Sequence, residues 1–203
     1  MIDGLVPFQI GTLVDDLDAT MDLHRSLGVR TWVSSGRTVG HYFDADRAEV
    51  VDTGVSIALG RLGSDTCLEL IATDRSGSVP WAWDPARITA TSHIGYWVDD
   101  VASAGNRLIR RGARLITARV PPDAGEDFVA DLVRGRLPVG LPMVYLEVGG
   151  GLLVELVSTA LWSSALPAAF GEGFTAAVPA PPGAQPSVPG IAGPSRSSAS
   201  TIR

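Results

Sequence analysis

The 203-residue chain contains no lysine: all 16 of its basic residues are arginine, and they stand against 22 acidic residues. Without lysine, neither a Schiff base nor an amine general base can take part in the chemistry of this protein. The formal net charge of −6 and the isoelectric point near 5.0 argue against nucleic acid or an anionic membrane as a partner.

Cysteine and long apolar runs are also scarce. The single cysteine, Cys67, forms no internal disulfide, which fits a reducing compartment. No stretch approaches the roughly 20 apolar residues of a membrane span. The N-terminus has no basic flank followed by an apolar run, so no signal peptide is expected. The sequence therefore predicts a soluble, cytoplasmic protein that does not bind membranes.

What the chain does contain is a repeat, because "FQIGTLVDD" at residues 8–16 returns as "SHIGYWVDD" at residues 92–100. Each copy alternates apolar residues and predicts a strand, at 8–14 and at 92–98. An Asp pair suited to capping a helix start follows each strand. The predicted helices, at about 17–27 and 101–111, each end at a glycine.

Three further strands complete each copy of the repeat. They are "VRTWVSS", "GVSIALGRL" and "TCLELIAT" in the first copy, and "ARLITARV", "MVYLEVG" and "GLLVELVST" in the second. Each copy therefore reads βαβββ. We expect an α+β fold in which two tandem βαβββ modules form a curled, half-open mixed β-sheet barrel with the helices outside.

The predicted divisions of the chain are a first module at 7–75, a linker at 76–90, a second module at 91–160, a docking helix at 161–175 and a tail at 176–203. The tail is rich in Pro, Gly, Ala and Ser. Such a segment lacks the apolar groups that would offset its ordering entropy, so we expect it to be disordered.

Four polar residues occupy equivalent positions in the two copies. Side chains alternate across a strand, so Gln9 and His93 point away from the face that packs under the helices. Glu69 and Glu155 stand in the apolar strands "LELI" and "VELV". A lone buried carboxylate is costly unless it is paired or binds a metal. These residues are interpreted as a metal site; a metal-free polar pocket and a degenerate remnant of a site are the alternatives.

The double βαβββ pattern with these polar positions resembles the vicinal-oxygen-chelate superfamily. That superfamily includes glyoxalase I, methylmalonyl-CoA epimerase, extradiol dioxygenases, fosfomycin-resistance enzymes and metal-free bleomycin-binding proteins. The resemblance covers about residues 7–159 and rests on "QIGTLVDDLDAT", "LELIAT", "HIGYWVDDV" and "LVELVS".

The resemblance implies a divalent metal site whose ligands are Gln9, Glu69, His93 and Glu155, a set similar to that of glyoxalase I. Such ligands suit Zn, Ni, Co or Mn. Oxygen activation is disfavoured, because non-haem Fe(II) oxygenases generally use two His and one carboxylate. A homodimer is implied by the habits of the superfamily.

The implied activity is that of a metal-dependent isomerase, lyase or hydrolase acting on a small molecule. The metal would stabilise an enolate or oxyanion, Glu155 would act as general base, and Glu69 would return the proton. The alternative from another class is a metal-free protein that sequesters a hydrophobic drug or metabolite.

Strand parity also predicts the residues that line the substrate pocket: Leu13, Cys67, Ile71, Trp97, Leu153 and Val157. This apolar lining favours a hydrophobic metabolite over a glutathione or coenzyme A adduct. Five arginines in predicted loops are open candidates for binding an anionic group: Arg37, Arg47, Arg119, Arg134 and Arg136. Specificity is expected from the long connections at about 36–52 and 119–141, the second of which resembles a lid.

Several other polar or aromatic residues have competing interpretations. His24 is interpreted as a surface or helix-packing residue more than a catalytic one, and His41 as a solvated loop residue more than one that enters the site. Cys67 is interpreted as a small buried hydrophobe more than a cavity residue. Glu147 is left open between solvent and the cavity. Trp81 and Trp83, in the predicted linker, are expected to join the two modules more than to bind substrate.

Overall fold

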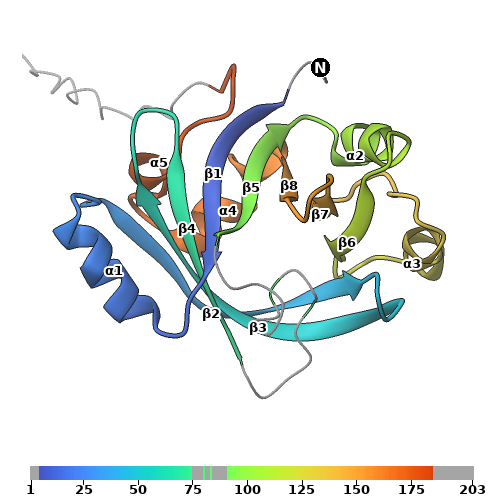
Figure 1. Cartoon of the computed structure of the whole chain (residues 1–203), viewed down its shortest axis with the longest axis horizontal. Helices are drawn as coiled ribbons and strands as arrows, with labels where there is room; N and C mark the ends of the chain where they lie inside the picture. The colour runs from blue at the N-terminus through green and yellow to red at the C-terminus, as the bar shows by residue number, and fades with distance from the viewer. Residues whose placement is uncertain (1–4, 75–79, 81–82, 84–90, 185–203) are drawn as a thin grey trace, which may run out of the picture.

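The computed structural model describes residues 5–74, Pro80, Trp83 and residues 91–184 (Figure 1). The first module contains β1 (Val6–Leu13), α1 (Leu17–Ser26), β2 (Trp32–Asp44), β3 (Glu49–Arg61) and β4 (Cys67–Thr73). The second contains β5 (Thr91–Val98), α2 (Val101–Ile109), β6 (Arg114–Arg119), α3 (Glu126–Val133), β7 (Met143–Glu147) and β8 (Leu153–Ser158). A short 3₁₀ turn (Thr159–Leu161), α4 (Ala165–Phe170) and α5 (Phe174–Ala177) follow.

The eight strands close into one barrel in the order β1-β4-β3-β2-β6-β7-β8-β5. The modules join at two seams. β1 and β5 pair antiparallel along most of their length, whereas β2 and β6 share only three residue pairs, from Tyr42–Arg119 to Asp44–Thr117. The predicted α+β fold with a curled mixed sheet is confirmed. The second seam is short, so the part of β2 that precedes Tyr42 is not paired with β6.

The predicted helix boundaries follow from local capping. The Asp16 side chain accepts a hydrogen bond from the backbone N–H of Ala19 at 2.9 Å, and Asp100 does the same for Ser103. Both helices are followed by glycines with positive φ, 102° at Gly28 and 96° at Gly112, where a side chain would be strained. The Asp and Gly residues of the repeat therefore set the start and end of α1 and α2.

Apolar side chains gather in layers on both sides of the sheet. Outside the barrel, α1 packs Met21 against Leu68 and Leu70, and α2 and α3 pack on a larger cluster over the second module. Inside the barrel, one cluster surrounds Phe8 and Trp97, and another contains aromatic residues of β2 and β7. The interior is thus filled by side chains except at the site described below.

Two expectations about the connections are wrong. Residues 36–52 belong mostly to the β2–β3 hairpin, in which His41 pairs with Asp52, so this stretch is strand where a loop was predicted. Residues 119–141 contain α3, which packs on the outer cluster around Leu132 and does not line the cavity. Neither segment acts as a lid over the site in this structure, but Tyr42 of the first segment and Arg119 of the second do line the cavity.

The C-terminal segment packs on the fold beyond residue 176. α4 contacts β2, and α5 contacts both β2 and β3 (Figure 1). Ala177 and Val178 are buried, and the indole N–H of Trp97 donates to the Pro179 carbonyl at 3.2 Å. The predicted start of the tail at 176 is therefore too early, because Ala177 and Val178 pack in the cluster around Phe8 and Trp97. Residues 185–203 lie outside the described residues, as does most of the predicted linker.

No helix within the described ranges is long and apolar enough to cross a lipid bilayer.

We expect a chain that ends at Thr175 to be less stable than a chain that ends at Ala184. The shorter chain loses the buried Val178 side chain and the hydrogen bond to Trp97, together worth roughly 2–4 kcal/mol. For a protein of this size that loss lowers the melting temperature by roughly 5–15 °C. Thermal unfolding by circular dichroism measures the difference. Equal melting temperatures for the two chains would contradict the packing of this segment.

Candidate metal centre

Four neighbouring strands of the barrel each direct one polar side chain to the same point. β4, β1, β5 and β8 lie next to one another and contribute Glu69, Gln9, His93 and Glu155 in that order. All four residues are buried; His93 is fully enclosed, and the most exposed, Glu69, is 7% accessible. The structure thus brings together the four residues that the repeat predicted as ligands.

Two glycines make room for this cluster. Gly11 stands opposite Glu69 on one side and His93 on the other, and Gly95 stands opposite Gln9 and Glu155. A Cβ at Gly11 would fall on the imidazole ring of His93, and a Cβ at Gly95 would lie 2.9 Å from Cβ of Gln9. The repeated "IG" therefore has a steric role, because each glycine leaves space for a ligand side chain from the strands beside it.

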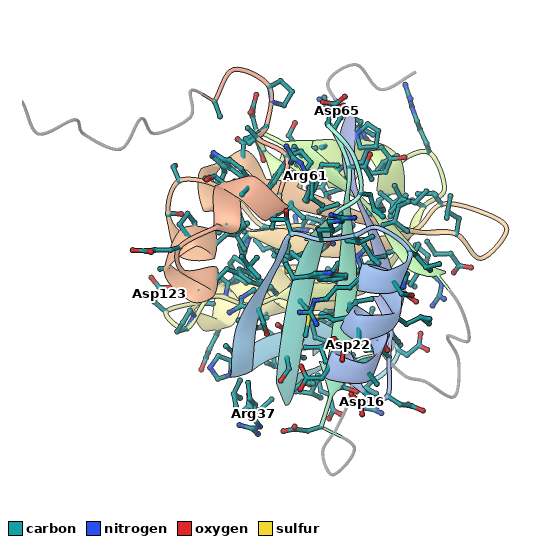
Figure 2. All side chains as sticks on the ribbon, turned by 90° about the vertical axis from the view of Figure 1, so that its left-hand side faces the viewer. Asp16, Asp22, Arg37, Arg61, Asp65 and Asp123 are labelled. Carbon is teal, nitrogen blue, oxygen red and sulfur yellow. The ribbon has the colours of Figure 1, made fainter. Side chains whose placement is uncertain are left out.

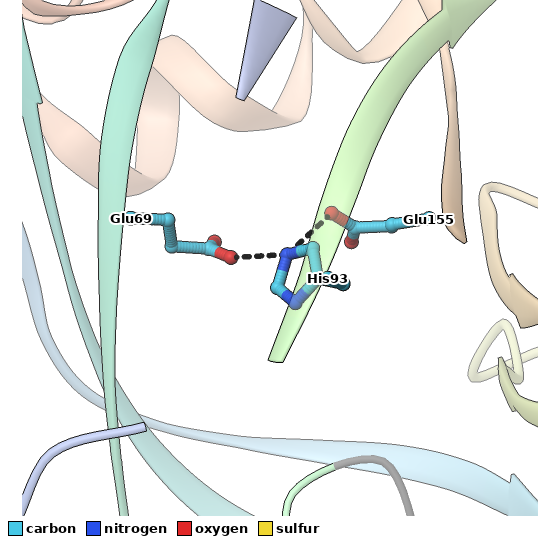
Figure 3. Close-up of side chains that lie close together, drawn as sticks. All are labelled: Glu69, His93 and Glu155. Atoms are coloured by element: carbon cyan, nitrogen blue, oxygen red, sulfur yellow. Dashed lines mark ion pairs between the residues drawn. The ribbon is translucent and has the colours of Figure 1, made fainter. Parts of the chain in front are cut away.

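The polar atoms lie within hydrogen-bonding distance of each other. The Gln9 amide nitrogen is 2.7 Å from Glu69 Oε2, 3.0 Å from Glu155 Oε2 and 3.0 Å from His93 Nε2. His93 Nε2 also lies 3.0 Å from Glu69 Oε2 and 3.3 Å from Glu155 Oε2. Figure 3 shows the two carboxylates approaching the imidazole from opposite sides.

The cluster concentrates charge where water cannot screen it. Burial alone would lower the pKa of His93, but the hydrogen bonds that it donates to Glu155 and Glu69, together with their negative charges, raise it to about 9. Burial raises the pKa of Glu69, and the charge of Glu155 adds to this effect. His93 is therefore an imidazolium at neutral pH, and its positive charge lies beside the two buried carboxyl groups.

The donor set fits a divalent cation. One atom from each of Glu69, His93 and Glu155 lies within 4.8 Å of the others, and the Gln9 amide reaches the same centre. A half-turn of this amide exchanges its nitrogen for Oε1, which makes it an oxygen ligand. A divalent ion with a neutral His93 would leave the site without net charge, so the buried carboxylates would be compensated.

A cavity of about 240 Å³ opens on this centre. Gln9, Glu69 and Glu155 form its polar end. Its walls come from both modules and from the C-terminal helices, and they are mostly apolar: among the lining residues are Phe8, Ile57, Leu59, Val157, Leu161, Leu166, Phe170 and Phe174. The cavity therefore combines a polar end with a hydrophobic body, the usual composition of a small-molecule site.

The structure places most of the predicted substrate-lining residues away from this cavity. Of the six, only Val157 lines this cavity. Cys67 and Trp97 pack in the cluster around Phe8, while Leu13, Ile71 and Leu153 pack in the cluster of β2 and β7. These side chains point into the barrel, as predicted. In a closed barrel, however, most inward side chains pack against one another and do not border a cavity.

Most of the residues that line the cavity were not predicted from the sequence. Tyr42 and Tyr145 lie at the cavity from β2 and β7, and the Tyr145 ring packs edge-on to His93 with 4.9 Å between centroids. The α4 residues of the wall could not be predicted from the sequence, because "ALPAAF" is an apolar segment that could pack anywhere on the sheet.

Three other candidate residues, Trp83, Glu147 and His24, lie at different places in the structure. Trp83 contacts Tyr42 and Tyr145 edge-on, at 4.5 and 5.8 Å, so it bridges the two modules and also lines the cavity. Glu147 pairs with Arg114 at 2.8 Å away from the cavity, and His24 lies on α1 beside Trp32. Trp81 lies outside the described residues.

The fold and site define a class of protein: two βαβββ modules that enclose a buried site of amide, imidazole and carboxylate donors. A family model described as the Glyoxalase/Bleomycin resistance protein/Dioxygenase superfamily matches residues 8–130. The chain belongs to this superfamily, and the resemblance seen in the sequence is confirmed.

Solved structures with a similar fold include methylmalonyl-CoA epimerases. A selenomethionine form of one is 16% identical over 78% of this chain and 98% of that chain, with a TM-score of 0.45. The enzyme from Mycobacterium tuberculosis is 22% identical over 78% and 91%, with a TM-score of 0.43. Hypothetical protein BH1468 from Bacillus halodurans C-125 is 16% identical over 77% and 95%, with a TM-score of 0.46. The comparison with curated proteins gave no match.

Replacing Gly11 by alanine is expected to displace His93, because the new methyl group would occupy the position of the imidazole ring. The strain should cost roughly 1–3 kcal/mol of stability. Thermal unfolding measures this loss, with Gly63→Ala as the control, since a Cβ at Gly63 meets no atom within 4 Å. If Gly11→Ala melts at the temperature of the control, the close approach of Gly11 to His93 is wrong.

The metal-free protein should lose stability as pH rises from 7 to 9.5. The folded pKa of His93, about 9, lies above its ordinary value of 6.5, so the charged imidazole stabilises the fold at low pH and this contribution disappears through pH 9. The loss is roughly 2 kcal/mol, or a fall in melting temperature of roughly 4–8 °C.

Few other side chains titrate in this window. The chain has no lysine, and burial raises the pKa of both Cys67 and Tyr42. Melting curves in the presence of a chelator, for wild type beside His93→Gln, isolate the effect. A wild-type melting temperature that stays constant or rises with pH would be evidence against a protonated His93.

Proposed function

We propose that this protein is a divalent-metal-dependent enzyme of the isomerase, lyase or hydrolase type that acts on a small hydrophobic molecule. The observation that carries the proposal is the convergence of Gln9, Glu69, His93 and Glu155 at the polar end of an apolar cavity. Zn, Ni, Co and Mn all suit this donor set.

A divalent ion held by these four side chains would supply a Lewis acid that stabilises negative charge on a substrate oxygen. The chain's own contribution is proton transfer and enclosure. Glu155 is the general base, and Glu69, whose pKa burial raises, returns the proton. The two carboxylates approach His93 Nε2 from opposite sides (Figure 3), and a substrate held between them would lose a proton to Glu155 and regain one from Glu69.

The cavity favours a compact hydrophobic substrate. Its body is lined by aromatic and aliphatic side chains of β1, β3, α4 and α5. Such walls exclude water, so that the carboxylates act in a medium of low dielectric, where their charge is effective. The cytoplasmic location and the homodimer predicted from the sequence remain predictions.

The second candidate, a metal-free binding protein, is favoured by one specific contact. The Gln9 amide nitrogen donates to both carboxylates, and His93 Nε2 lies within hydrogen-bonding distance of the same two oxygens, so the polar end is satisfied without an ion. In that case the hydrophobic body of the cavity would supply the binding energy for a sequestered drug or metabolite.

Metal content separates the two candidates. After incubation with Zn²⁺ and desalting, wild type should retain about one ion per chain, and Glu155→Ala should retain at least roughly tenfold less, because one anionic ligand is gone. Glu147→Ala is the matched control: it removes a strand carboxylate that pairs with Arg114 outside the cavity. Elemental analysis gives the stoichiometry.

Retention in wild type and in the control, with loss in Glu155→Ala, supports the enzyme. If wild type retains none of Zn²⁺, Ni²⁺, Co²⁺ or Mn²⁺, the catalytic proposal is overturned in favour of the binding protein.

A further inference from the structure

The cavity wall carries a cation that the metal centre does not use. Arg119, at the end of β6, lines the cavity and is half-buried. Its Nη1 donates to the Tyr42 hydroxyl at 3.0 Å, and it forms no ion pair with any residue that the structure describes. An unpaired guanidinium in a mostly apolar wall retains most of its five N–H donors for a ligand.

The other arginines that the sequence offered as anion binders are engaged elsewhere. Each is exposed and pairs with an aspartate: the pairs are Arg37–Asp74, Arg47–Asp44, Arg134–Asp131 and Arg136–Asp131. Figure 2 shows Arg37 projecting from the outer edge of the fold. None of these four arginines lines the cavity, so Arg119 is the candidate that the tertiary structure selects.

The position of Arg119 is fixed by its neighbours. Its guanidinium carbon lies 5.6 Å from the centre of the Tyr42 ring, and these two residues are paired across the short seam between the modules. Tyr42 is itself fully buried and held edge-on by Trp83. The guanidinium is therefore oriented before any ligand arrives, which lowers the entropic cost of binding.

We propose that Arg119 and Tyr42 form a subsite for an anionic oxygen group, so that the substrate is a hydrophobic molecule with metal-chelating oxygens at one end and a carboxylate at the other. This deepens the function proposed above and rests on it for the chelating end. A planar guanidinium matches a carboxylate through two parallel hydrogen bonds. One cation suits one such group, whereas the several phosphates of a coenzyme A would require more.

The test uses benzohydroxamic acids, which chelate divalent metals, with a carboxylate attached at the para position through zero to three methylene groups. Each has a neutral partner of the same shape, the carboxamide. Affinities are measured by calorimetry for Zn²⁺-loaded wild type, Arg119→Gln and Arg37→Gln, and again with chelator present.

For at least one linker length, the carboxylate should bind wild type and Arg37→Gln at least roughly tenfold more tightly than its carboxamide. Arg119→Gln should bind the two alike, while keeping wild-type affinity for the carboxamide. Retained carboxamide affinity shows that the variant is folded. Tyr42→Phe should reduce the preference without abolishing it, because the guanidinium loses its fixed orientation.

The outcomes separate the two proposals. If no linker length shows a carboxylate preference in wild type, or if Arg119→Gln keeps the preference, the anionic subsite is overturned, whatever the metal does. If the preference is present and depends on Arg119 but the chelator changes no affinity, the anionic subsite stands and the metal-dependent function fails. A preference together with a chelator-sensitive affinity supports both.

Discussion

The structure is organised around the burial of two carboxylates, Glu69 and Glu155, within hydrogen-bonding distance of one imidazole nitrogen. Buried charges of the same sign at this separation are costly unless a positive group compensates them. In the metal-free molecule His93 supplies that charge, with the Gln9 amide as donor, and a divalent ion would supply it more fully.

The repeat brings the two carboxylates, the imidazole and the amide together with two residues from each module. Each module contributes one residue from its first strand and one from its last, and these strands lie together because β1 pairs with both β4 and β5. Gly11 and Gly95 keep the centre open by omitting a side chain where the ligands meet. The C-terminal helices do not follow this symmetry. Residues of α4 and α5 form part of the apolar wall of the cavity, and Arg119 is the arginine among the described residues that line it.

Much of this could be predicted from the sequence. The order of strands and helices in each module, the Asp caps, the glycines after α1 and α2, and the four converging positions all follow from local patterns that repeat at a fixed offset. The lining of the cavity could not be predicted, because strand parity says only that Cys67, Ile71 or Trp97 points inward. It does not say which inward residues pack together and which border a space.

What the sequence alone determined is therefore the architecture and the donor set, because strand alternation, capping and the duplicated "IG" act over a few residues. The tertiary structure decided where the cavity lies, which arginine reaches it, and that the chain stays packed as far as Ala184. These depend on the limited β2–β6 seam and on the docking of two short helices, which bring together residues far apart in the chain. No local pattern encodes such contacts, since their free energy comes from packing between distant segments.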